Sequence, residues 1–239
     1  MAKTILVTGA SSGIGRAIAI ACAAKGMTVI LNGRNIARLE ETQARMDGDG
    51  HIIIPADLTN QAQREQLISQ VPMLNGVVHC AGIGSRVMCK MLESDDVQHV
   101  MDANFTAPVL LQAALLQEKK ISMEASIVFI ASAAATMPSV GNSIYSASKA
   151  ALIAYAKCIA LELAPRKIRV NCISPAMVWT DLALVGATEE QLHKAEQAYP
   201  LKRYGQPDDI APMAVYLLSD EAKWVTGSNM EITGGTQTL

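Results

Sequence analysis

The chain has 239 residues, of which 50% are hydrophobic but only 4% aromatic, and its formal net charge at pH 7 is -2. This length fits one large domain or two small ones, and the aliphatic composition is typical of helices packed on a sheet. The balanced charge offers no basic field to a polynucleotide backbone, which argues against nucleic acid as the main partner.

No uninterrupted apolar stretch approaches the roughly 20 residues that a membrane-spanning helix needs. The first apolar residues, Ile5 to Val7, run directly into a glycine-rich turn, so no signal peptide is expected. The cysteines form no CxxC pair and have no histidine at ligand spacing; they are Cys22, Cys80, Cys89, Cys158 and Cys172. We therefore expect reduced thiols in a cytoplasmic protein that has no structural metal and no membrane partner.

Short β-branched runs alternate along the chain with longer segments in which apolar residues recur every three or four positions. Strands are expected at 4–8, 28–32, 51–55, 76–79, 126–132, 169–173 and 229–232. Helices are expected at 14–25, 36–46, 61–70, 95–117 and 143–163, with another starting near Pro207. This alternation predicts an α/β fold, a Rossmann-type doubly wound parallel sheet of about seven strands with helices on both faces, in three layers.

No linker, repeat or low-complexity tract divides the sequence, so residues 1–239 are interpreted as a single domain. One long stretch without strand character, 176–206, follows the sixth strand and is predicted to be a substrate lid. Its apolar residues either form a wall around the substrate or pack within the lid; they are Met177, Trp179, Leu182, Leu184 and Val185.

A glycine-rich turn, Thr8–Gly15, joins the first strand to the first helix. Gly9 allows a sharp exit from the strand, Gly13 allows close approach of a phosphate, and Gly15 allows the helix to pack on the sheet. The helix N-terminus behind it offers free N–H groups to a pyrophosphate. A purely structural turn is the alternative, and the strand–turn–helix context favours a dinucleotide site.

The end of the second strand carries no acidic residue, which an NAD-preferring site would place there for the ribose hydroxyls. Arg34 instead supplies a cation for a 2′-phosphate, so NADP(H) is predicted over NAD(H); the alternative is an ordinary solvated arginine. Asp57, after the third strand, either hydrogen-bonds an adenine amino group or caps the helix that begins near Gln61.

Tyr145 and Lys149 lie four residues apart in a segment of small and apolar residues. On a helix they share a face, and an ammonium lowers the pKa of a phenol toward the working range of a general acid. Ser132, at the end of its strand, is expected to point its hydroxyl at the same substrate oxygen. A tyrosine and a lysine at this spacing are also a common surface pair.

Asn104 is a fourth candidate. Pro108 follows four residues later and has no N–H for the Asn104 carbonyl, so in a continuous helix that carbonyl is free to hold a water. The alternative is a helix that simply begins near Pro108.

With these residues the whole chain resembles the short-chain dehydrogenase/reductase family in its single-domain form. The resemblance depends on TGASSGIG (Thr8–Gly15), Ala81 and Gly82, Asn104, Ser132, YSASK (Tyr145–Lys149), segment 171–180 and the final YPLKRYGQPDDIAPMAVYLLSD and VTGSNMEITGG. Within the family it is most similar to 3-oxoacyl-acyl-carrier-protein reductases.

The resemblance implies a role for each catalytic position. Tyr145 would be the general acid/base, Ser132 would polarise the carbonyl, Lys149 would hold the nicotinamide ribose and lower the Tyr145 pKa, and Asn104 would position a water. Val178 and Thr180 would contact the nicotinamide carboxamide and a nearby phosphate. The implied cofactor site consists of Gly9, Ser11, Ser12, Gly13, Ile14, Gly15, Arg34, Asp57, Leu58, Cys80, Ala81, Gly82, Tyr145, Lys149, Pro175, Val178 and Thr180.

Two departures from the family pattern are expected to alter affinity rather than activity. His79-Cys80 replaces Asn-Asn, which removes an amide near the adenosine ribose, and Ala176 replaces a glycine.

A carrier-protein substrate would require cations near the cleft. The candidates are Arg166, Lys167, Lys119 and Lys120, although Met123 stands at a position that is basic in the resembling reductases.

Three functions stay open: a reductase of 3-oxoacyl thioesters, an oxidoreductase of another alcohol or ketone such as a sugar or steroid, and a non-catalytic nucleotide-binding protein. Apolar surfaces on the helices near 104–117 and 143–163 predict a homodimer or homotetramer.

Overall fold

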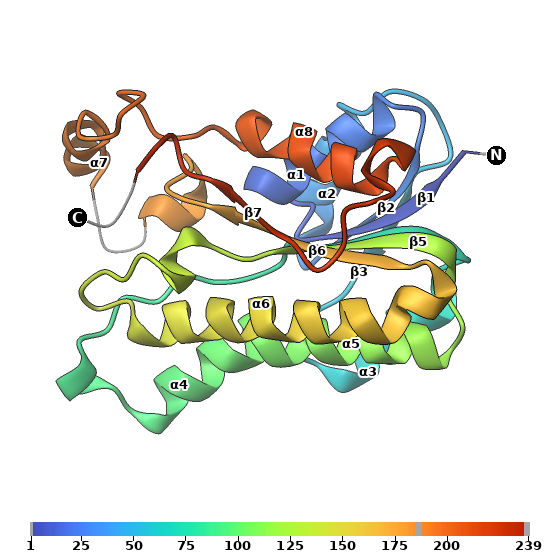
Figure 1. Ribbon diagram of the computed structural model, residues 1–239, viewed down its shortest axis with the longest axis horizontal. Helices are drawn as coiled ribbons and strands as arrows, with labels where there is room; N and C mark the ends of the chain where they lie inside the picture. The colour runs from blue at the N-terminus through green and yellow to red at the C-terminus, as the bar shows by residue number, and fades with distance from the viewer. Residues whose placement is uncertain (1, 185–187, 237–239) are drawn as a thin grey trace.

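A seven-stranded parallel sheet forms the centre of the computed structural model, which describes residues 2–184 and 188–236 (Figure 1). The strands are β1 (Thr4–Thr8), β2 (Thr28–Gly33), β3 (Ile52–Pro55), β4 (Leu74–His79), β5 (Ile121–Ile130), β6 (Arg169–Pro175) and β7 (Asn229–Ile232). Their order is β3-β2-β1-β4-β5-β6-β7, and every pairing is parallel. Because the order reverses between β1 and β4, a crevice is expected beyond the carboxyl ends of these strands.

Helices cover both faces of the sheet, as the sequence predicts (Figure 1). One face carries α1 (Gly13–Ala23), α2 (Ile36–Gln43) and α8 (Pro207–Leu218), packed through one buried cluster. The other carries α3 (Gln61–Gln70), α5 (Ala107–Gln117) and α6 (Ser143–Leu163), packed through a second cluster. The two clusters bury both faces of the central strands, which explains their continuous apolar runs. The predicted three-layer fold is confirmed.

The predicted fifth strand is wrong at both ends. β5 begins at Ile121, which pairs with Leu74, and it ends at Ile130, so Ser132 lies two residues beyond the strand. Ser122, Met123 and Glu124 concealed this start because they are not β-branched. Glu124 adopts a left-handed backbone (φ 61°) beside a register shift opposite β4.

The predicted helix at 95–117 is interrupted. α4 (Ser94–Met101) passes into a π-helical turn, η2 (Asp102–Thr106), and only then into α5. A π-turn places one extra residue in the helix and is often found at functional sites.

The lid segment, 176–206, contains a helix that the sequence analysis missed. α7 (Glu189–Glu196) begins at a capping box in which Thr188 accepts from the Gln191 N–H and the Gln191 side chain accepts from the Thr188 N–H. The sequence signal was present as Thr-x-x-Gln, the pattern typical of such a box. Val185, one of the predicted apolar lid residues, lies outside the described residues.

By length and composition, residues Ser143–Arg166 could cross a membrane. The expectation that no uninterrupted apolar stretch has this length still holds, because the helix passes only on its mean hydropathy and contains charged residues. In this fold α6 is a core helix: Leu152, Ala156 and Ile159 are buried in the cluster beneath the sheet.

Candidate active site

A cleft of about 1240 Å³ opens beyond the carboxyl ends of the strands. Its walls come from the glycine turn, the ends of β2 to β6, the start of α6 and the lid segment. All seventeen predicted cofactor residues line it, and so does Ser132. Asn104 does not: it is 1% exposed and lies beneath the wall of the cleft.

The glycine turn is packed too tightly for side chains. A Cβ at Gly15 would meet the carbonyl oxygen of Gly9, and a Cβ at Gly9 would lie 2.9 Å from the Ala81 nitrogen. Gly13 has φ +52°, and its Cβ would lie 3.0 Å from Thr180 Cγ2. The turn therefore contacts both the β4 end and the lid segment, leaving its backbone exposed to the cleft.

The side chain of Thr8, the first residue of the glycine turn, connects the end of β1 to the residues that follow β4. Thr8 Oγ1 accepts hydrogen bonds from the backbone nitrogens of Cys80 (3.0 Å) and Ala81 (3.1 Å). These bonds satisfy two N–H groups at the point where β4 leaves the sheet.

Arg34 lies in the cleft and is largely exposed, with 72% of its side chain accessible. Its Nη1 lies 4.0 Å from Asp57 Oδ2. Asp57 does not cap α3, because Asn60 does so by accepting from the Gln63 N–H. Burial acts to raise the pKa of Asp57, but hydrogen bonds from Thr59 and the charge of Arg34 outweigh it and lower this pKa.

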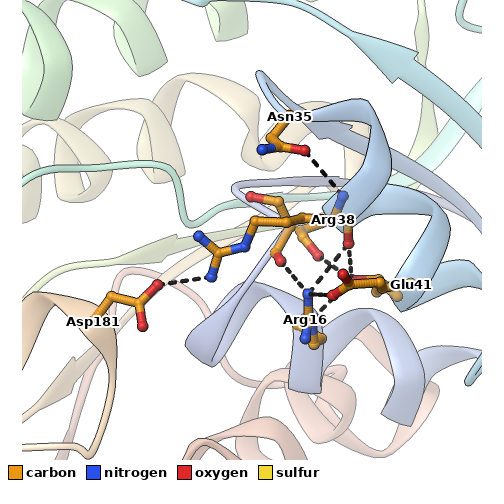
Figure 2. A network of polar contacts seen from close by, with 8 residues as sticks. Arg16, Asn35, Arg38, Glu41 and Asp181 are labelled. Carbon is orange, nitrogen blue, oxygen red and sulfur yellow. Dashed lines mark hydrogen bonds and ion pairs between the residues drawn. The ribbon is translucent and has the colours of Figure 1, made fainter.

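A second arginine beside Arg34 was missed by the sequence analysis. Arg38 Nη2 contacts Asp181 Oδ2 at 2.7 Å, linking α2 to the lid segment across the cleft (Figure 2). Arg16 supports this arrangement, since its Nη2 donates to the carbonyls of Ser11 (2.6 Å) and Arg38 (3.2 Å) (Figure 2). Arg38 comes four residues after Arg34, which precedes α2, and only the fold brings Arg38 to Asp181.

The predicted reacting groups meet at the other end of the cleft. Tyr145 and Lys149 lie one turn apart on α6, and Lys149 Nζ is 5.9 Å from the centre of the tyrosine ring. Ser132 caps the short turn Ala133–Ala135 and faces the phenol. They are not a surface pair: Lys149 is 5% exposed.

The expected lowering of the Tyr145 pKa by Lys149 is wrong for the protein alone. Burial raises the pKa of Tyr145, a hydrogen bond with Ser132 lowers it, and the nearby Cys80 thiol raises it. Desolvation outweighs the other effects because the phenolate would lose its water on this buried helix face.

Lys149 is itself strongly perturbed. Burial lowers its pKa from 10.5 to about 8, against smaller opposing effects of the Cys80 and Cys172 thiols. Its Nζ donates a 2.9 Å hydrogen bond to the carbonyl of Ile130.

Asn104 sits in the π-turn and holds the loop after β4. Its Oδ1 accepts from the Ile83 N–H (2.8 Å), and its Nδ2 donates to the Ile83 carbonyl (3.0 Å) and to Ser148 (3.2 Å). The helix runs through this position, so it does not simply begin near Pro108, which has no N–H for the Asn104 carbonyl. A Cβ on Gly82 would lie 2.9 Å from Asn104 Oδ1 and 3.4 Å from Lys149 Nζ.

His79, the first of the two positions that depart from Asn-Asn, lies outside the cleft. It is 2% exposed, stacks on Phe129 with ring centres 4.5 Å apart, and its Nε2 lies 3.0 Å from Gln112 Oε1. Burial lowers its pKa to about 4, so it is a neutral core residue. Of this pair, Cys80 alone lines the cleft.

The predicted apolar wall is formed only in part. Met177 and Leu182 line the cleft, whereas Trp179 packs inside the lid segment against His193 and Tyr204. Met177 and Leu182 therefore fit the interpretation as a wall of the substrate site, and Trp179 fits packing within the lid segment.

The cations proposed for carrier-protein docking are not near the cleft of their own chain. They precede β5 and β6, at the amino ends of these strands, and the ten-residue β5 alone spans roughly 33 Å. Three of them also have partners: Arg166 donates to the Ile121 carbonyl, Lys120 to the Val71 carbonyl, and Lys167 pairs with Glu124.

Metal ligands do not gather in this fold. In the part of the chain that the structure describes, no three or more His, Cys, Asp or Glu side chains are placed to hold an ion.

Known proteins are similar to this chain in sequence and in fold. Residues 9–237 match the family model described as enoyl-(acyl carrier protein) reductase. The 3-oxoacyl-[acyl-carrier-protein] reductase of Rickettsia felis is 33% identical over 98% of this chain and 96% of its own length. A solved structure described as a short chain dehydrogenase/reductase family protein is 33% identical, with a TM-score of 0.88 over 98% of this chain and 96% of its own.

The chain belongs to the short-chain dehydrogenase/reductase family. Members of this family include the L-xylulose reductase of Caenorhabditis elegans, 33% identical over 98% of this chain and 95% of that protein. As a short-chain dehydrogenase/reductase, the protein is an NAD(P)-dependent oxidoreductase acting on C=O and CH–OH groups.

Proposed function

We propose that this short-chain dehydrogenase/reductase uses NADPH to reduce a ketone to a secondary alcohol, with Tyr145 as the general acid. The observation that carries the proposal is the convergence of Tyr145, Ser132 and Lys149 in the cleft that begins at the glycine turn. NADPH, when bound, supplies the hydride to the carbonyl carbon.

Side chains of the protein would donate the proton and stabilise the negative charge that develops on the carbonyl oxygen. Tyr145 donates its phenolic proton to the carbonyl oxygen, and the Ser132 hydroxyl donates a hydrogen bond to the same oxygen. The resulting phenolate is stabilised by the ammonium of Lys149, which the Ile130 carbonyl holds one turn away. Asn104 fixes the wall beneath Lys149 and leaves its own carbonyl for a water in the proton relay.

A preference for NADP(H) over NAD(H) follows from the charges at the β2 end. Arg34 is exposed in the cleft, and its Asp57 contact at 4.0 Å is too long to neutralise it fully. No acidic residue directly follows β2 to repel a 2′-phosphate, because the strand ends at Gly33 and Arg34 and Asn35 come next. Asp57 would then remain near the adenine, held by Thr59.

The preferred substrate is a 3-oxoacyl thioester, because the relative from Rickettsia felis carries that activity in its name. A second candidate is another small ketone or alcohol. The distance between the cleft and the basic residues before β5 and β6 favours this alternative, as does the likeness to an L-xylulose reductase. A non-catalytic nucleotide-binding role has no such support, since the reacting groups are all present.

The protein is further proposed to self-associate and to work in the cytoplasm. Leu110 on α5 is 44% exposed and Leu161 on α6 is 79% exposed, and pairing across a two-fold axis would bury both. All five cysteines are free, as in a reducing compartment. A monomer mass in light scattering at micromolar protein concentration would contradict this assembly.

The deciding experiment is NADPH oxidation with an acetoacetyl thioester by the wild type and by Tyr145→Phe. Loss of the general acid should lower kcat by roughly 100- to 10,000-fold while NADPH still binds. Tyr155→Phe is the matched control, because this tyrosine is on the same helix but packs against Phe105 and Phe129. Equal turnover by Tyr145→Phe and the wild type would reject the mechanism.

A further inference from the structure

The charges that line the cleft do not cancel. Six of its lining residues are charged: Arg34, Arg38, Asp57, Arg86, Lys149 and Asp181. Each carboxylate faces an arginine, Asp57 facing Arg34 and Asp181 facing Arg38. The Lys149 ammonium donates a hydrogen bond to the Ile130 carbonyl. Of these six, only Arg86 has neither a hydrogen bond nor an ion pair with a described residue through its charged group.

Arg86 is held beside the start of the catalytic helix. Its neighbour Val87 donates a 2.8 Å hydrogen bond to the Gly141 carbonyl. Gly141 has φ +78°, and a Cβ there would lie 3.3 Å from Arg86 Cγ, so the loop before α6 packs directly on the arginine stem. Tyr145 follows Gly141 by four residues. Arg86 therefore belongs to the reacting end of the cleft rather than to the β2 end, where Arg34 lies.

Apart from Asp57 and Asp181, no carboxylate is among the described residues that line the cleft. Its polar lining also includes Ser85, Ser139, Asn142 and Gln191, together with Tyr199 and Tyr204. The Arg86 charge reaches Tyr204, where it counteracts the rise that burial and its neighbours Tyr199 and Glu196 cause in the phenol pKa. Arg86 itself is an exposed side chain that lines the cleft.

We propose that Arg86 binds an anionic oxygen group of the substrate, a carboxylate or a phosphate, while the keto group lies at Tyr145 and Ser132. An arginine suits this task because its planar fork donates two parallel hydrogen bonds to such a group. The inference rests on the proposed ketone reduction and adds the substrate class: ketones that carry an anion. A free keto acid would supply a carboxylate, and a pantetheine thioester would supply its 4′-phosphate.

Two pairs of ketones, each differing by one charge, test the assignment. The first is 5-oxohexanoate against its methyl ester, and the second is acetoacetyl-4′-phosphopantetheine against acetoacetyl-pantetheine. Arg86→Gln should lower kcat/KM for an anionic member roughly 10- to 100-fold and leave its neutral partner unchanged. Arg86→Lys should keep part of the preference, because it retains the charge without the fork.

Lys90→Gln is the matched control. Lys90 is an exposed cation four residues further along that does not line the cleft, so its loss should leave all four values unchanged. A loss confined to 5-oxohexanoate identifies a carboxylate substrate, and a loss confined to the phosphopantetheine thioester identifies the thioester arm. Equal effects on charged and neutral members, or none on either, would overturn the assignment.

Failure of the proposed function gives a different result. If the wild type binds NADPH but reduces none of the four ketones, the proposed reduction of such ketones is rejected. The Arg86 assignment is then decided by calorimetric titration of the enzyme–NADP⁺ complex with 5-oxohexanoate and with 4′-phosphopantetheine. Binding that Arg86→Gln abolishes supports the anion site, and absence of binding refutes it.

Discussion

Lys149 Nζ donates a 2.9 Å hydrogen bond to the carbonyl of Ile130, the last residue of β5. This bond fixes α6 against the end of the strand, so that Tyr145, one turn earlier on the helix, faces Ser132, two residues beyond the strand. The same bond keeps an ammonium in a buried site. The catalytic arrangement is therefore expected to reduce the stability of the fold.

Replacing Lys149 by methionine should separate stability from activity. Burial lowers the Lys149 pKa from 10.5 to about 8. Between these values the unfolded chain binds a proton that the folded protein does not, so the free energy of unfolding of the wild type rises with pH. Below pH 8 the full cost of the buried charge is present, roughly 3 kcal/mol at about 1.4 kcal/mol per pH unit.

Lys149→Met removes that charge but leaves the Ile130 carbonyl without its donor, which costs about 1–3 kcal/mol. At pH 7 the variant should be inactive yet about as stable as the wild type in urea unfolding. From pH 8 to pH 10 the wild type should gain stability relative to the variant. Lys157→Met, an exposed position on the same helix, should show no such trend. Parallel stability curves for Lys149→Met and the wild type would contradict the prediction.

Arg34→Ala should change the choice of cofactor. Loss of a charge-assisted contact with the 2′-phosphate should raise the KM for NADPH roughly tenfold and leave the KM for NADH unchanged. Arg45→Ala removes another exposed arginine of the same region that lies outside the cleft, and should alter neither value. If Arg34→Ala weakens both cofactors equally, the 2′-phosphate assignment is wrong.

Gly15→Ala should damage the cofactor end of the cleft. The added methyl would meet the carbonyl oxygen of Gly9, and relief of this contact must displace α1 from the turn, at about 1–3 kcal/mol. Both the unfolding midpoint and NADPH affinity should fall, as seen by denaturation and by fluorescence titration.

Gly26→Ala is the control for Gly15→Ala. Gly26 has φ +72° and open space around its Cβ direction, so alanine there should cost about 1 kcal/mol of backbone strain. Its NADPH affinity should remain that of the wild type. Similar NADPH affinities for the two variants would show that close packing at Gly15 does not shape the site.

Glu196→Ala should loosen the lid segment. One Glu196 oxygen accepts from Trp179 Nε1 (3.0 Å) and the Tyr204 N–H (3.3 Å), while the other lies 2.9 Å from His193 Nδ1. Loss of these contacts should raise the KM for the ketone roughly threefold to tenfold, with NADPH affinity unchanged, and should speed proteolysis within the segment. Glu190→Ala, an exposed residue on the same helix, should have no effect on either measurement. Unchanged proteolysis in Glu196→Ala would remove the proposed support.

Most of the fold could be predicted from local patterns. β1, β7, α3 and α6 have the bounds that the sequence predicts. For α3 the cap residue Asn60 marks the start. Two of the errors fall where a long-range contact is present. Residues 122–124 belong to β5, in which Ile121 pairs with Leu74, and the helix through Asn104 contains a π-turn where the Asn104 side chain binds the Ile83 backbone. The missed helix α7 is a different case, because its capping box was visible in the sequence.

The succession of strands and helices along the chain, the glycine turn and the Tyr145–Lys149 spacing follow from local sequence, since each depends on neighbours within a few residues. The pairing and burial of the charged side chains depend on the fold. It pairs Arg38 with Asp181 across 143 positions of sequence, buries Lys149 and His79, and leaves Arg86 facing the cleft. The physical reason is that desolvation and ion pairing depend on distances between segments remote in sequence, which no local pattern encodes.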